Sequence, residues 1–153
     1  MVYFEPFKED EFKQYWNYSV NSWKKDMVRA GLIDERVTFK EAEEQIKRFV
    51  PNGLKTPNHY FMHIVSEGQK IGNLWLEIRK RGATEAYLWD ILINEDQRGK
   101  GYGKSTTAKI HQFAKEKGAA KISLNVFAYN GVARNLYETL GYHEAAITMI
   151  KFL

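Results

Sequence analysis

The sequence contains no cysteine. The chain therefore forms no disulfide, has no thiolate nucleophile and binds no metal through sulfur, which fits a reducing compartment. No apolar run approaches the roughly 20 residues needed to cross a bilayer. The first residues also lack the basic start and apolar core of a signal peptide. We therefore expect a cytoplasmic protein without a membrane partner.

The excess of positive over negative charge is also small. The formal net charge is +4, and no long basic stripe is visible, so a polyanionic small ligand suits the chain better than nucleic acid. A length of 153 residues suggests one domain with room for a core. Histidine, aspartate and glutamate do not recur at metal-ligand spacing, so we expect no metal.

Apolar spacing and turn residues predict an alternation of helices and strands. Thr38 and Glu41 form a capping box at the start of a helix that ends before Pro51. The other expected helices are 9–30, 104–117 and 130–140, and the expected strands are 2–7, 59–65, 70–78, 85–93, 121–127 and 142–152.

A glycine-rich loop follows the expected strand 85–93. Gly99, Gly101 and Gly103 alternate with Lys100 in this loop, and a helical pattern begins directly after it. Glycines let backbone N–H groups approach a ligand, and a helix start adds unpaired N–H groups and a partial positive charge. The order strand, loop, helix therefore favours a phosphate or pyrophosphate site. A plain strand-to-helix connection is the alternative.

Three cations, Arg98, Lys100 and Lys104, surround this loop. Two familiar phosphate motifs do not fit. A Walker A loop ending at Ser105 needs glycine at the position of Arg98, and the pattern G-x-G-x-x-G needs glycine at Lys104 or Thr106. The loop is therefore a candidate phosphate site of another kind.

Two segments resemble the GNAT family of N-acetyltransferases. Residues 98–103, Arg-Gly-Lys-Gly-Tyr-Gly, fit the family's acetyl-CoA loop Q/R-x-x-G-x-G/A. Asn130, Ala133 and residues 136–142, Leu-Tyr-Glu-Thr-Leu-Gly-Tyr, match the block N-x-x-A-x-x-L-Y-E-x-x-G-F/Y. The two motifs stand in the family's order, and the resemblance is close from about Ile71 to the end.

The resemblance implies a single GNAT domain over residues 1–153. The implied fold is α/β, a GNAT-like three-layer α/β/α arrangement with a mixed, mainly antiparallel sheet and splayed central strands. Acetyl-CoA is the implied cosubstrate, without a metal. The implied reaction is direct acetyl transfer in a ternary complex to an amine of a small molecule or peptide. The oligomeric state is left open by the sequence, with a homodimer as one option.

The resemblance also assigns contacts with the coenzyme. Backbone N–H groups of the loop would bind the pyrophosphate, and the preceding strand would pair with the pantetheine amides as with an added strand. The residues so assigned are Ile91, Leu92, Ile93, Arg98, Gly99, Lys100, Gly101, Tyr102, Gly103, Lys104, Asn130, Arg134 and Tyr137. Asn130 and Arg134 equally suit capping or surface positions.

Two residues are candidates for catalysis. Tyr137 matches the family tyrosine that protonates the leaving thiolate, whereas by spacing alone it is one residue of an apolar helix face. Asp90 is a charge within an apolar strand, where it is either a functional base or a structurally bonded carboxylate. Many members carry a glutamate just before this aspartate, and Trp89 stands there instead. Glu77 and His63 are therefore substitutes to consider, His63 more often being structural.

Two other functions remain open from the sequence. A non-catalytic acyl-CoA-binding module would bind the coenzyme and acetylate no amine. A nucleotide or nucleic-acid binder would use the same basic loop, and its nucleic-acid affinity would fall steeply with salt. The modest net charge disfavours the latter.

Overall fold

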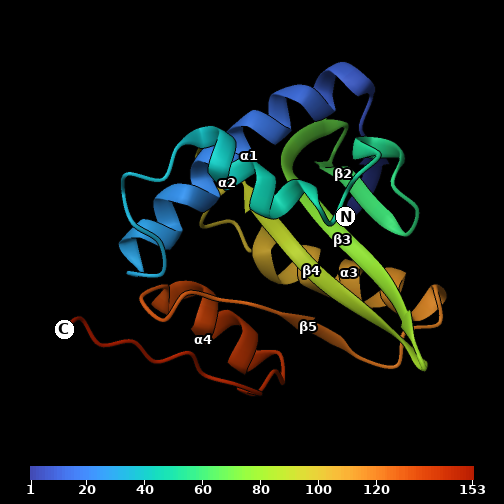
Figure 1. Cartoon of the computed structure of the whole chain (residues 1–153). Coiled ribbons are helices and arrows are strands. Elements are labelled where there is room, and N and C mark those ends of the chain that lie inside the picture. Colours follow the sequence, from blue (N-terminus) through green and yellow to red (C-terminus); the bar gives the residue numbers. More distant parts are fainter. The chain divides into compact units, whose positions relative to one another are not determined.

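The computed structural model describes residues 1–153 and contains one five-stranded sheet and four α-helices (Figure 1). The chain divides into two compact units. The first unit comprises residues 1–12 and 50–125, and the second comprises residues 13–49 and 126–153. Each unit is described by itself below.

The first unit holds the whole sheet, in the order β1-β2-β3-β4-β5. Strands β1 to β4 are antiparallel to their neighbours, and β5 runs parallel to β4. The predicted α/β class and the mixed, mainly antiparallel sheet are confirmed. The strands are β1 Val2–Pro6, β2 His59–Ser66, β3 Gln69–Arg81, β4 Ala83–Ile93 and β5 Ile122–Leu124.

Helix α3, Tyr102–Glu116, covers one face of this sheet (Figure 1). Successive residues of a strand point to opposite faces, so alternate apolar side chains of β2 and β3 meet the helix. Ile64, Leu74 and Leu76 are fully buried there with Ile110 of α3. Burial of such side chains is the main stabilising contribution to a small domain.

Strand β5 is shorter than the predicted strand 121–127. It contains only Ile122–Leu124 and pairs with β4 from Ala86 to Leu88. Beyond it the backbone enters a turn in which the carbonyl of Phe127 accepts a hydrogen bond from the N–H of Asn130 at 2.9 Å. The residues after Leu124 therefore join a turn into the next helix instead of the sheet.

The second unit contains α2, Phe39–Lys47, α4, Gly131–Thr139, and most of α1, Glu9–Arg29. The capping box of α2 is confirmed, since Thr38 Oγ1 accepts from the N–H of Glu41 at 3.2 Å and a Glu41 carboxylate oxygen accepts from the N–H of Thr38 at 2.9 Å. The three predicted helices of this part of the chain are present.

The predicted final strand, 142–152, is wrong, because residues 142–153 form no strand. The apolar side chains that suggested it are largely exposed, and Phe152 is 79% exposed. Ile150 and Phe152 lie instead against Gly31, beyond the end of α1, where a methyl group added to the glycine would come within 2.7 Å of Ile150 Cδ1. Side-chain contact with Gly31 therefore takes the place of strand pairing.

Helices in this structure are too short or too polar to cross a lipid bilayer.

Gly72→Ala tests the closeness of β3 and β4. Gly72 lies opposite Ile93, and a methyl group at residue 72 would stand 2.1 Å from the Leu92 carbonyl oxygen. We expect a loss of about 1–3 kcal/mol in the free energy of unfolding, because backbone atoms must move apart. Urea unfolding measures it, with Gly131→Ala as control, since nothing lies within 4 Å of that position. Equal stability of the two variants would contradict the packing described.

Candidate functional site

The glycine loop, residues 98–103, lies in the first unit between β4 and α3. Gly99 and Gly101 have φ angles of 76° and 81°, a left-handed conformation that side chains resist. The first i to i−4 bond of α3 runs from the N–H of Ser105 to the carbonyl of Gly101 at 3.2 Å. The amides of residues 102–104 therefore have no acceptor within the helix. Nothing lies within 4 Å of the place that a methyl group would take at Gly99 or Gly101, so this part of the loop is open to an anion.

The cations of the loop have different roles. The Nε of Arg98 donates to the carbonyl of Ile93 at 2.9 Å and so fastens the loop to the end of β4. Lys100 donates to the side-chain oxygen of Gln97 at 3.3 Å, and Lys104 is exposed in the first turn of α3. The last two ammonium groups remain near solvent, where they add positive potential to the helix start.

Strand β4 has an open edge beyond its short pairing with β5. The β4–β5 register ends at Leu88, and the β3–β4 register shifts so that Trp75 pairs with Asp90 and Leu76 with Leu88. Trp89 is therefore the extra residue of a bulge, which bends a strand and increases its twist. Beyond the bulge, β4 continues to Ile93 without a strand on its β5 side.

The direction of the backbone groups follows from one hydrogen bond. The N–H of Asn94 donates to the carbonyl of Ile71 on β3 at 2.8 Å. Because hydrogen-bonded pairs alternate along an antiparallel ladder, Leu92 also bonds toward β3, whereas the backbones of Ile91 and Ile93 point to the open edge. The carbonyl of Ile93 receives Arg98 there. Two predicted backbone contacts, Ile91 and Ile93, therefore face one open edge that leads into the loop.

Asp90 is half-buried and lies opposite Trp75. Directly opposite residues of an antiparallel pair share a face, so Asp90 lies on the sheet face of Trp75 and Glu77. This face is opposite to the one that α3 covers, because the neighbouring residues Leu74 and Leu76 belong to the α3 cluster.

Glu77 is the centre of a polar cluster on that face. Its Oε1 accepts from Arg79 Nε at 2.9 Å and from Trp89 Nε1 at 3.0 Å, while its Oε2 lies 3.7 Å from His59 Nε2. Trp75 Nε1 donates to His59 Nδ1 at 3.0 Å. Burial lowers the pKa of His59. The sequence indicated Glu77 as a candidate but did not indicate His59 or Arg79. The only sequence feature that could have indicated them is their position as polar residues that alternate with apolar ones along two strands that pair.

His63 belongs to a different contact. Its Nε2 lies 2.8 Å from Glu11 Oε2, and Lys70 Nζ binds the same oxygen at 2.7 Å. Phe7 packs on the imidazole with ring centroids 4.4 Å apart. These contacts join the first turn of α1 to the sheet, which supports the structural interpretation of His63.

Glu11→Gln tests this contact through its pH dependence. Lys70, the N–H of Lys8 and His63 lower the pKa of Glu11 to about 2. Because this pKa is below that of an unfolded glutamate, about 4.3, the ionised carboxylate stabilises the fold at neutral pH and its contribution is lost as the pH falls toward 2. Urea unfolding should show a stability gap between wild type and Glu11→Gln that narrows between pH 4.5 and pH 2.5. A gap that stays constant, or one matched by the exposed control Glu35→Gln, would refute this role.

The remaining predicted residues lie on or beside α4 in the second unit. Asn130 caps the helix, its side-chain oxygen accepting from the N–H of Ala133 at 3.2 Å. Arg134 pairs with Glu144 at 2.7 Å. Tyr137 is buried, and its ring centroid lies 5.2 Å from that of Tyr142. In this unit Asn130 therefore has the capping role that the sequence left open, and Arg134 forms a surface ion pair.

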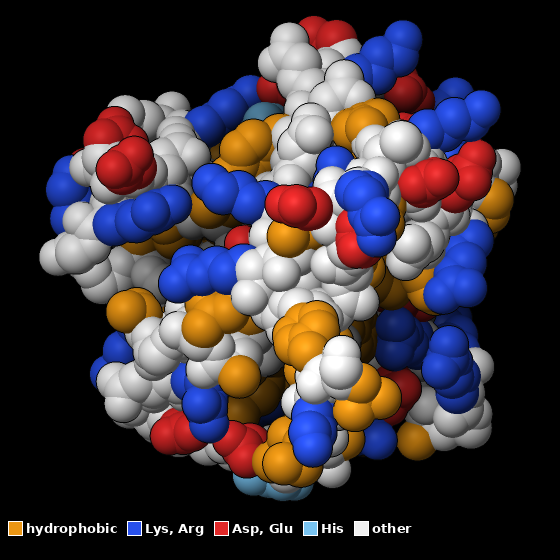
Figure 2. All heavy atoms as spheres, turned by 60° about the vertical axis from the view of Figure 1, so that its left-hand side comes forward, with side chains coloured by type: hydrophobic (Ala, Val, Ile, Leu, Met, Phe, Trp, Pro, Cys, Tyr) orange, Lys and Arg blue, Asp and Glu red, His pale blue; other side chains and the backbone are white.

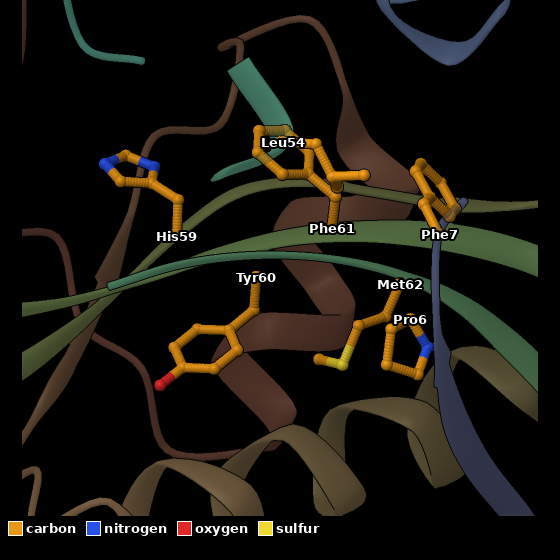
Figure 3. Close-up of a pocket in the computed structure, with 7 residues that line it drawn as sticks. All are labelled: Pro6, Phe7, Leu54, His59, Tyr60, Phe61 and Met62. Atoms are coloured by element: carbon orange, nitrogen blue, oxygen red, sulfur yellow. The ribbon is translucent and has the colours of Figure 1, made fainter. Parts of the chain in front are cut away.

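A small cavity of ≈ 190 Å³ lies at the edge of β2, where β1 has ended. Figure 3 shows His59 and Phe61 on one side of β2, with Leu54 and Phe7 near them, whereas Tyr60 and Met62 point to the other side. The cavity is separated from β4 by β3, roughly 10 Å at the usual strand spacing. It is therefore distinct from the open edge. Its lining residues are Pro6, Phe7, Leu54, His59, Tyr60, Phe61 and Met62.

The charged side chains are relevant to metal binding and to the distribution of charge on one face. No cluster of three or more histidine, aspartate or glutamate side chains is arranged to hold a metal ion. On the face drawn in Figure 2, lysine and arginine side chains are interspersed with acidic and apolar ones.

Comparison with known proteins identifies the family. Residues 9–142 match the Acetyltransferase (GNAT) family. Over 150 residues, the chain is 33% identical to the uncharacterized N-acetyltransferase YycN of Bacillus subtilis, covering 97% of this chain and 96% of that protein. The crystal structure of YycN superposes with a TM-score of 0.94 at 32% identity, covering 100% of this chain and 99% of that one.

Shorter matches concern enzymes with named acceptors. Over 58 residues the chain is 38% identical to thialysine N-epsilon-acetyltransferase of Sus scrofa, covering 38% of this chain and 34% of that protein. Over 63 residues it is 35% identical to the [ribosomal protein bS18]-alanine N-acetyltransferase of Escherichia coli, covering 41% and 43%. The family match spans most of the sequence, and the sheet with its open edge agrees with it. This chain belongs to the GNAT family of acetyltransferases.

Proposed function

We propose that this protein transfers the acetyl group of acetyl-CoA to the amino nitrogen of a small molecule or peptide, directly and within a ternary complex. One observation carries the proposal: the open edge of β4 at Ile91 and Ile93 continues into the glycine loop within the same unit. An edge followed by an anion site suits a ligand that carries amides at one end and a pyrophosphate at the other.

The chain's own groups account for binding of the coenzyme. Amides of residues 102–104, aided by Lys100 and Lys104, bind the pyrophosphate at the start of α3. The N–H of Ile93, next to the loop, pairs with a pantetheine amide as a neighbouring strand would. The N–H of Ile91, farther from the loop, polarises the thioester carbonyl and stabilises negative charge as the amine attacks, because the thioester lies at the end of the coenzyme away from the pyrophosphate.

Direct transfer requires two proton movements. The amine loses a proton as its nitrogen bonds to the acetyl carbon, and the sulfur gains one as the carbon–sulfur bond breaks. We propose that the Tyr137 hydroxyl donates the proton that sulfur gains, because Tyr137 stands at the tyrosine of the matched motif. A phenol, with a reference pKa near 10, is protonated at neutral pH and can act as this donor. Asp90, on the open-edge strand, is a candidate to accept the first proton, directly or through water.

The experiment is a panel of amines with release of free CoA thiol as the readout. The names of the two partial matches suggest thialysine and a peptide with N-terminal alanine, and spermidine and glucosamine 6-phosphate extend the range. We expect saturable thiol release with at least one amine and an acetylated product by mass spectrometry. Tight binding of acetyl-CoA without any product would instead identify a non-catalytic acyl-CoA-binding module.

A further inference from the structure

The two carboxylate oxygens of Glu77 have different surroundings. Oε1 accepts hydrogen bonds from Arg79 and Trp89, whereas Oε2 lies 3.7 Å from His59 Nε2. That distance is too long for a hydrogen bond. The side chain is 17% exposed, and Oε2 is not a fully buried atom without a partner. This oxygen can therefore accept a hydrogen bond from a ligand N–H that reaches the exposed part of the carboxylate.

His59 does not neutralise this oxygen. Its Nδ1 accepts from the indole of Trp75 at 3.0 Å, which places the single proton of a neutral imidazole on Nε2. Burial lowers the pKa of His59, with Arg79 contributing and Glu77 opposing, so the ring is uncharged at neutral pH. Tyr87, which lies opposite Glu77, has a pKa raised by burial and is also uncharged. Asp90 on the same face is a carboxylate and supplies no positive charge. Arg79 is therefore the only described cation on Glu77, and it engages Oε1.

Aromatic rings surround the carboxylate. Trp75 and Trp89 stack with centroids 4.8 Å apart, and Tyr87 meets Trp89 edge-on at 4.8 Å. The guanidinium of Arg79 already lies over Tyr87 at 4.0 Å, which shows that these rings accept a cation. Aromatic faces beside a carboxylate favour an ammonium ligand with an apolar chain.

Trp89 connects Glu77 to the open edge. It is the bulge residue of β4, two positions before Ile91, and its indole reaches back across the sheet to Glu77. One indole therefore connects the carboxylate to the residue two positions before Ile91, whose N–H we assign to the thioester. It shares its sheet face with Asp90, whose partner in the register, Trp75, is two residues from Glu77.

We infer that Glu77 is the carboxylate that binds the ammonium group of the acceptor and takes its proton during acetyl transfer, with Arg79 and Trp89 positioning it. This inference rests on the proposed function. One proton passes from the ammonium nitrogen to Oε2 and then to solvent, which frees the nitrogen lone pair. The nitrogen then bonds to the acetyl carbon, the carbon–sulfur bond breaks, and the second proton that nitrogen loses balances the one that sulfur gains. An ammonium acceptor and acetyl-CoA thereby give the amide, CoA thiol and one proton.

The test compares Glu77→Gln with wild type on the best amine of the panel. We expect kcat/KM at pH 7 to fall at least 100-fold, while the Kd of acetyl-CoA changes less than twofold. The deficit should shrink as the pH rises toward the pKa of the amine, because an amine that is already neutral needs no acceptor for that proton. A purely structural role of Glu77 would not produce this convergence.

Glu85→Gln is the matched control, since Glu85 lies on β4 opposite Arg79, is a similarly buried carboxylate at 19% exposed, and pairs with Lys121 at 3.2 Å. We expect its kcat/KM to stay within threefold of wild type. If Glu77→Gln does not fold, Glu77→Asp keeps the charge for Arg79 and withdraws it by one methylene, and at least a tenfold fall is expected.

Each outcome supports or overturns the assignment of Glu77. If the wild-type protein acetylates an amine and Glu77→Gln or Glu77→Asp has an unchanged kcat/KM, the inference is overturned and the proposed function still stands. A wild-type protein that acetylates no amine overturns the proposed function, and this inference with it.

Discussion

Gly101→Val lowers the affinity for acetyl-CoA by roughly 100-fold or more. Gly101 precedes α3 with a φ of 81°, so a β-branched residue forces the loop into another conformation. The amides of residues 102–104 then no longer converge on one anion. Hydrogen bonds to charged groups contribute about 1.5–3 kcal/mol each, and losing one or two of them accounts for a change of this size. Isothermal titration with acetyl-CoA measures it.

Gly82→Val is the matched control for this prediction. Gly82 has a φ of 71°, and a methyl group added there would have nothing within 4 Å, as at Gly101. It sits in the turn between β3 and β4, so its substitution brings comparable backbone strain without touching the loop. Coenzyme affinity should stay within threefold of wild type. Equal losses in the two variants would assign the effect to reduced stability and not to the anion site.

Tyr137→Phe lowers kcat by roughly 100-fold or more, the usual range for loss of a general acid. The hydroxyl is removed while the buried ring is kept, so the free energy of unfolding and the Kd of acetyl-CoA should change little. Steady-state thiol release on the best amine measures kcat. A variant with the full kcat would exclude the acid role and leave Tyr137 as a packing residue of α4.

Tyr142→Phe is the control for the tyrosine prediction. The two rings lie 5.2 Å apart, and burial, together with the neighbouring Tyr137, raises the pKa of Tyr142 to about 12. Tyr142 lies outside the assigned machinery, so its substitution should leave kcat within threefold. A loss of rate only in Tyr142→Phe would transfer the acid role to that residue.

Local signals in the sequence were sufficient for much of the fold. The capping box at Thr38, the glycines at both ends of α3 and the Asn130 cap act over a few neighbouring residues, and the structure confirms each helix they delimit. Apolar runs and the turn between residues 66 and 69 likewise predicted β2, β3 and β4. Such signals are read reliably because the interactions behind them span only three or four positions.

Long-range pairing was the part that sequence could not decide. Residues 142–152 are rich in apolar residues and were expected to form a strand, yet strand formation also needs a partner edge, and Ile150 and Phe152 lie against Gly31 instead. Strand β5 stops at Leu124 for a similar reason, because the following backbone enters a turn. β-propensity depends strongly on such context.

Long-range strand pairing also decides between His63 and Glu77, the two residues considered as alternatives to Asp90 for the general base. From the sequence, His63 and Glu77 were alternating polar residues in neighbouring strands. Register decides between them: His63 meets Glu11, whereas Glu77 meets Trp89 because the bulge turns that indole toward β3. A one-residue change in register would reverse the face of each side chain, so this assignment required the structure.

The coenzyme site is tested by thermal unfolding of the wild-type protein with acetyl-CoA, CoA, ATP or no ligand. A ligand at 100 times its Kd stabilises the native state by about 2.7 kcal/mol, which raises the Tm of a domain of this size by several degrees. We expect acetyl-CoA and CoA each to raise the Tm, and ATP at the same concentration to leave it unchanged. An unchanged Tm with both coenzymes would contradict the assignment of the open edge and glycine loop to acetyl-CoA.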